Sequence, residues 1–75
     1  LRFALPRPEA VTLRIYDLAG RRVRELIAGT VFPAGRHDIS WDGRDGRGKP
    51  VASGTYVYRI EAGSFEATRR MVLVR

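Results

Sequence analysis

The sequence has no cysteine and only one histidine among its 75 residues. A chain of this length forms one domain at most, and it buries little apolar surface. Natural domains of this size often gain stability from disulfides or a bound metal, but neither is evident here. No apolar run approaches the roughly 18 residues that a membrane-spanning helix needs. The sequence therefore predicts one domain, residues 1–75, with no cofactor and no membrane span.

Acidic residues are scarce relative to basic ones. The chain has 14 basic and 8 acidic residues, a formal charge of +6, and Lys49 is its only lysine. Such an excess fits an anionic partner, for example a surface glycan or lipopolysaccharide. However, the arginines alternate with apolar residues, as on the solvent-facing sides of strands. No nucleic-acid-binding motif accompanies the charge, so nucleic acid is not an expected partner.

Alternation of apolar and polar residues predicts strands in the first half of the chain. It is clearest over residues 11–17, where Leu13 and Ile15 face the core. Residues 18–20 read as a hairpin loop with Gly20 in a left-handed conformation, and residues 21–27 return as the partner strand. A helix over 18–28 is the competing interpretation, because this segment contains good helix formers.

The rest of the chain follows the same pattern. Further strands are predicted at 2–5, 36–41, 55–61 and 65–74, with 28–35 as a connection. Strands at roughly ten-residue spacing indicate an all-β fold, a small antiparallel sandwich of about six to seven strands of the immunoglobulin or fibronectin type III class. We expect Trp41 to end its strand buried between the sheets. The predicted core comprises Leu13, Ile15, Val23, Ile39, Trp41, Tyr56, Tyr58, Ile60, Met71 and Leu73.

The segment between Trp41 and Tyr58 is rich in turn-forming residues and contains four of the eight glycines. Its two aspartates suggest a calcium loop, but calcium takes about six to eight oxygen ligands and the next residues here are cations. Each aspartate is instead expected to accept hydrogen bonds from backbone N–H groups just downstream. The residues predicted to fix this loop and the hairpin are Gly20, Asp42, Gly43, Asp45 and Gly54.

The remaining polar residues form no catalytic pattern. His37 has no cysteine or second histidine to complete a zinc site, and no serine lies in a nucleophile-elbow context. Glu61 and Glu66 flank a predicted turn, where ion pairing with arginine is more typical than acid–base catalysis. The aromatic residues at the ends of the central loop leave a carbohydrate-binding accessory module as an alternative to their use in the core. We therefore expect a protein without enzymatic activity.

Several motifs resemble, in order and spacing, those of the FlgD-type Ig-like domain. They are V-T-L-R-I-Y-D-L-A-G-R-R-V at 11–23, G-R-H at 35–37, W-D-G-R-D at 41–45, G-K-P-V-A-S-G-T-Y at 48–56 and R-R-M-V at 69–72. The resemblance runs from about Phe3 to the end of the chain. This domain occurs in flagellar hook-capping proteins, and closely similar modules resemble the C-terminal sorting domain of type IX secretion. The resemblance implies a fold, while one such module serves several classes of protein.

The resemblance implies an extracellular or cell-surface module. The sequence L-P-R-P at 5–8 replaces the Asn-Pro pair that often opens sorting domains, and the W-D-G-R-D loop is longer than theirs, which favours the hook-cap form. The chain ends directly after its last predicted strand, as a C-terminal module would. The expected function is secretion or sorting, surface anchoring or assembly of a larger bacterial protein, with a hook-cap domain and a filament subunit as alternatives.

Protein partners are expected at strand edges, because a sandwich of few strands leaves backbone groups unpaired there. The candidates are the parent chain, the secretion machinery and neighbouring subunits. Phe3 and Leu5 are the predicted contact residues, since they share one face of the first strand and can fill a groove on this domain or on a neighbour.

Overall fold

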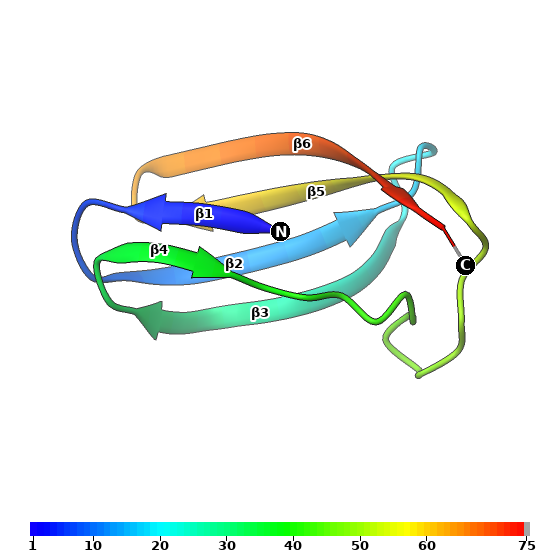
Figure 1. Cartoon of the computed structure of the whole chain (residues 1–75), viewed down its shortest axis with the longest axis horizontal. Helices are drawn as coiled ribbons and strands as arrows, with labels where there is room; N and C mark the ends of the chain where they lie inside the picture. The colour runs from blue at the N-terminus through cyan, green and yellow to red at the C-terminus, as the bar shows by residue number, and fades with distance from the viewer. Residues whose placement is uncertain (75) are drawn as a thin grey trace.

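A computed structural model describes residues 1–74 as an all-β chain (Figure 1). Within this range no helix is present, so the helical interpretation of 18–28 is wrong: the segment forms a hairpin loop and the start of a strand, paired with its neighbour. No helix that could cross a membrane is found among these residues. The strands are β1 (Arg2–Leu5), β2 (Glu9–Tyr16), β3 (Arg22–Phe32), β4 (Gly35–Asp38), β5 (Gly54–Ala62) and β6 (Phe65–Leu73).

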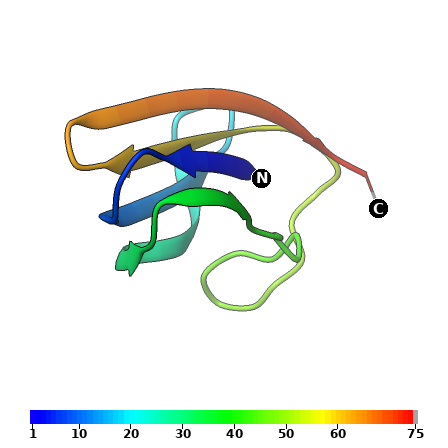
Figure 2. The same ribbon diagram turned by 60° about the vertical axis from the view of Figure 1, so that its left-hand side comes forward.

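These strands form two antiparallel sheets. The large sheet has the order β3–β2–β5–β6, and the small sheet pairs β1 with β4. The small sheet lies over the middle of the large one, and β6 lies beyond it on the side of β1 (Figures 1 and 2). The prediction of a small antiparallel Ig-like sandwich is confirmed, with six strands described.

The inner face of the large sheet is built on β2. Val11, Leu13 and Ile15 alternate with partly exposed neighbours and are completely buried, because successive side chains of a strand point to opposite faces. Ile60 lies opposite Leu13 in the register with β5 and continues this face. The main core cluster comprises Leu5, Val11, Leu13, Ile27, Ile60 and Ala62.

Strand β3 is longer than the sequence predicted. The segment 28–35 was expected to be a connection, yet the strand continues to Phe32. The pairing of β3 with β2 continues past a β-bulge, because Thr30 lies opposite Val11 and Ala28 lies opposite Thr12. Gly29 is therefore the extra residue of the bulge, and its φ is 74°. Glycine adopts this backbone conformation without a steric penalty, so it prolongs the strand instead of ending it.

Strand β4 is shorter than the predicted strand 36–41 and ends at Asp38. The ladder with β1 closes at Ile39, which exchanges two backbone hydrogen bonds with Leu1 (2.7 and 2.8 Å). Trp41 therefore lies in the following loop and is half-buried, not buried between the sheets as predicted. Its indole N–H needs a hydrogen-bond acceptor, and a loop carbonyl supplies one at the rim of the core.

The structure buries four of the predicted core residues fully: Leu13, Ile15, Tyr56 and Ile60. The small sheet has only two strands, so it leaves the margins of the large sheet partly uncovered. The predicted core residues that are only half-buried are Val23, Ile39, Trp41, Tyr58, Met71 and Leu73.

Candidate functional site

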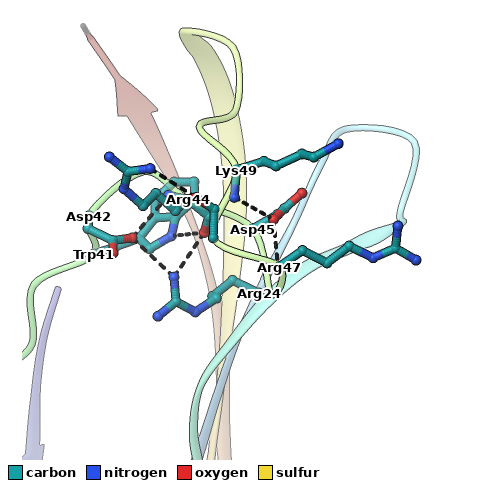
Figure 3. Close-up of polar contacts among 8 residues, drawn as sticks. Arg24, Trp41, Asp42, Arg44, Asp45, Arg47 and Lys49 are labelled. Atoms are coloured by element: carbon teal, nitrogen blue, oxygen red, sulfur yellow. Dashed lines mark hydrogen bonds and ion pairs between the residues drawn. The ribbon is translucent and has the colours of Figure 1, made fainter.

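Asp45 organises the tip of the loop between β4 and β5. Its Oδ1 accepts hydrogen bonds from the backbone N–H groups of Arg47 (2.8 Å) and Lys49 (3.0 Å) (Figure 3). The backbone N–H of Asp45 donates to the carbonyl of Lys49 (2.9 Å), which closes the turn. The N–H groups of Lys49 and Arg47 hold the pKa of the Asp45 carboxyl below its ordinary value. This turn has the form predicted from the sequence, an aspartate bonded to the backbone just downstream.

Asp42 and Arg24 attach the same loop to the large sheet. Asp42 Oδ1 accepts from the backbone N–H of Arg44 (3.0 Å) and from Nη1 of Arg24 on β3 (3.1 Å). The same Arg24 nitrogen donates to the carbonyl of Arg44 (3.1 Å). The backbone N–H of Gly46 also donates to the carbonyl of Val23 (3.2 Å). The loop therefore caps the start of β3 at an edge that would otherwise lie open.

Trp41 covers the inner side of this loop. Its indole N–H donates to the carbonyl of Arg44 (2.9 Å), and its ring meets Tyr56 edge to face with centroids 5.3 Å apart. The hydroxyl of Tyr56 in turn donates to the carbonyl of Ala52 (2.6 Å). The two rings pack on each other, and Tyr56 is buried, so they form no exposed platform for stacking on a sugar.

The hairpin between β2 and β3 is fixed by Asp17, a residue absent from the predicted set. Asp17 Oδ1 accepts from the backbone N–H groups of Ala19 (3.0 Å) and Arg21 (2.9 Å), and its Oδ2 accepts from Nε of Arg21 (3.0 Å). Gly20 has a φ of 85°, the left-handed conformation expected of it. An aspartate placed directly before L-A-G was the available sequence signal, because Asp commonly bonds the backbone two residues on.

An open concavity of about 720 Å³ lies between this hairpin and the loop tip, and we call it the loop–hairpin concavity. One wall consists of residues 45–47, Lys49 and Val51, and the other of Asp17 and residues 21–25. Five basic and three acidic side chains line it. Sequence reasoning missed this site, because its two walls are distant in the chain and only the tertiary contacts of β3 bring them together.

The predicted contact residues of β1 pack within the domain. Leu5 is buried in the core cluster, and Phe3 is half-buried, with its ring centroid 5.6 Å from that of Phe32 and 5.2 Å from that of His37. His37 also contacts the carbonyl of Pro33 through Nε2 (2.7 Å). These side chains fill a groove on their own domain, which is one of the two arrangements that the sequence allowed.

The family model of the FlgD Ig-like domain matches residues 1–65. The chain belongs to this family. No curated protein matches the sequence, and no solved structure matches it. The family match confirms the first half of the resemblance drawn from the sequence, while the likeness to type IX sorting domains stays a prediction.

The FlgD Ig-like domain is expected to need no calcium. The contacted oxygens of Asp42 and Asp45 already accept protein N–H groups, and no group of three or more potential metal ligands occurs among residues 1–74. Calcium needs about six to eight oxygen ligands. Thermal unfolding in EDTA and in millimolar calcium should give the same melting temperature. A calcium-dependent rise of several degrees would contradict this arrangement of the loop.

Acid is expected to destabilise the domain through three carboxylates. The backbone N–H of Arg21 lowers the pKa of Asp17, a hydrogen bond from Arg14 lowers that of Glu25, and the Asp45 pKa is lowered as described above. Because the folded-state values lie below the ordinary 3.8 of Asp and 4.5 of Glu, the unfolded state binds more protons in acid. The resulting stability is present in full above about pH 5 and is lost as the pH falls through the folded pKa values.

Melting temperatures measured from pH 7 to pH 2 test this expectation. The wild-type curve should be nearly flat above about pH 5 and fall below it. Asp17→Asn and Asp45→Asn should each lower the plateau and flatten the acid limb. An unchanged acid limb in both variants would show that these hydrogen bonds do not control the pH dependence.

Proposed function

We propose that this domain is a non-catalytic assembly module of the kind found in flagellar hook-capping proteins, acting outside the cell through contacts with other proteins. The family match over residues 1–65 supports this role more directly than a role in secretion. One side of the sandwich is open, and this observation supports contact with another protein at that side. There β1 has a free edge and β6 extends beyond the small sheet (Figures 1 and 2).

The free edge of β1 offers backbone groups to a partner strand. Leu1 and Ile39 exchange two hydrogen bonds, and opposed residues of an antiparallel pair alternate between bonded and non-bonded positions. The backbone N–H and C=O groups of Phe3 and Leu5 therefore point toward β4 and form the hydrogen bonds of the ladder. Those of Arg2 and Ala4 point away from β4, toward the free edge. An extended segment of another protein could pair with these groups and add a strand to the small sheet.

The inner face of β6 offers side chains to the same partner. Phe65 is 51% exposed there, and Met71 and Leu73 are only half-buried. Arg69 lies opposite Tyr58 in the register, on this same face, and makes no ion pair with any described residue. A strand added beside β1 would cover this face, and an acidic residue facing Arg69 would complement its charge.

Deleting residues 1–75 in frame from the parent gene, in its own bacterium, tests the role. If the domain acts in a hook cap, electron microscopy should show hooks that are missing or misshapen, with unassembled hook protein in the medium. Secretion of other proteins should be normal. Normal hooks, combined with retention of the parent protein inside the cell, would overturn the proposal in favour of the sorting role that the sequence also suggested.

Substitution at Ala4 tests the mode of contact. Ala4→Pro removes the one N–H group of that residue, which faces the free edge, and leaves the bonds between β1 and β4 in place. Ala4→Ser, the matched control, retains the N–H group. The proline variant should keep the melting temperature of the control yet lose hook assembly. Equal assembly by two equally stable variants would exclude strand addition at this edge.

A further inference from the structure

The loop–hairpin concavity has a charge distribution that the proposed assembly role does not use. Its three carboxylates are already bonded within the domain. Asp17 and Asp45 accept the backbone and arginine N–H groups described above, and Glu25 Oε2 accepts from Nε of Arg14 at 2.7 Å. Each of these carboxyl groups has a lowered pKa because of these bonds. All three are therefore ionised at neutral pH and held in fixed positions.

The basic side chains of the concavity are less fully engaged. Arg47 and Lys49 make no side-chain hydrogen bond or ion pair with any residue in the range 1–74 that the structure describes. Both extend to the same side of the loop, away from Trp41 (Figure 3). Across the concavity, Arg22 reaches its carboxylate partner Glu25 only at 3.8 Å. Arg47, Lys49 and the weakly paired Arg22 are therefore the cations that a ligand can engage at this site, where five basic side chains outnumber the three carboxylates.

We propose that this concavity binds a phosphate monoester carried by a sugar. A phosphate monoester has about two negative charges and three terminal oxygens, so it can accept the forked N–H groups of two arginines and the ammonium of a lysine together. A single carboxylate would satisfy one guanidinium and leave the other cations unpaired. The arrangement of the cations therefore favours phosphate over an acidic side chain.

The size and lining of the concavity indicate what carries the phosphate. At about 720 Å³ it has room for much more than a phosphate group. Its described lining includes no aromatic ring, so it offers no surface for stacking a nucleic-acid base. The fixed carboxylates retain lone pairs that can accept sugar hydroxyl groups. Together these features favour a phosphorylated sugar, of the kind found in a cell-surface glycan, over a nucleic acid.

Titration of the 75-residue chain with glucose 6-phosphate, followed by amide NMR, tests the proposal. Inorganic phosphate, glucose and sodium chloride serve as comparison ligands, all at one ionic strength so that screening stays constant. Glucose 6-phosphate should shift the amide signals of residues 21–25 and 45–49. These shifts should reach saturation at a lower concentration of glucose 6-phosphate than of any comparison ligand. Glucose and chloride should leave these signals unchanged, and inorganic phosphate should bind more weakly.

Two double variants with the same loss of charge separate a site from general attraction. Arg47→Gln with Lys49→Gln should weaken binding about tenfold, as expected for two exposed charged contacts. Arg36→Gln with Arg70→Gln, on the exposed faces of β4 and β6 and outside the concavity, should bind like the wild type. Equal losses in both double variants, or saturable shifts only outside residues 21–25 and 45–49, would overturn the proposal. Equal affinity for inorganic phosphate would overturn its assignment to a sugar. None of these outcomes depends on hook assembly.

Discussion

Leu13→Ala is expected to remove most of the stability of the domain. Leu13 is 0% exposed, and it lies at the centre of the large sheet, opposite Ile27 on β3 and Ile60 on β5. Truncating a buried leucine to alanine costs about 3–5 kcal/mol, because apolar contacts are lost and a cavity remains. A domain of this size has a total free energy of unfolding of about 4–11 kcal/mol. We expect a melting temperature roughly 15–30 °C below that of the wild type.

Leu18→Ala provides the matched control, because it removes the same atoms from a leucine that is 67% exposed in the hairpin loop. Its free energy of unfolding should stay within about 0.5 kcal/mol of the wild type. Urea unfolding monitored through Trp41 fluorescence measures both variants. Similar losses of stability in the two variants would show that the core is not centred on β2.

The strands with strict alternation were predictable from the sequence, because a residue period of two determines which side chains reach the core. Strands β2 and β5 are of this kind. The length of β3 was not predictable, because Gly29 can either end a strand or form a bulge within it, and the choice depends on the pairing available along β2. The end of β4 depends in the same way on β1, a strand 30 or more residues away in the register.

The candidate site likewise has one part that could be predicted from the sequence and one part that could not. The Asp45 turn follows from local chemistry, since the aspartate and its donors lie within four residues of one another. The contact between Arg24 and Asp42 joins residues 18 positions apart, and each of the two has several arginines or carboxylates as equally plausible partners in the sequence. Neither this contact nor the concavity beside it can be predicted without the packing of β3.

Trp41→Ala is expected to have the second-largest effect on stability. The side chain is half-buried, so its loss should cost about 2–3 kcal/mol, less than the 3–5 kcal/mol typical of a fully buried tryptophan. Two interactions contribute, the edge-to-face contact with Tyr56 and the hydrogen bond to the Arg44 carbonyl. The loop that lines the loop–hairpin concavity rests on both of them.

Trp41→Phe separates these two contributions. Phenylalanine keeps an aromatic ring against Tyr56 but cannot donate to the Arg44 carbonyl, and a hydrogen bond of this type contributes about 0.5–1.5 kcal/mol. Urea unfolding followed by far-ultraviolet circular dichroism, which does not need the tryptophan signal, should place Trp41→Phe between the wild type and Trp41→Ala. If both variants lose the same free energy, the ring contact contributes nothing measurable and the hydrogen bond alone holds the loop. If Trp41→Phe equals the wild type, the hydrogen bond to the Arg44 carbonyl contributes nothing measurable, and the ring contact with Tyr56 accounts for the whole loss in Trp41→Ala.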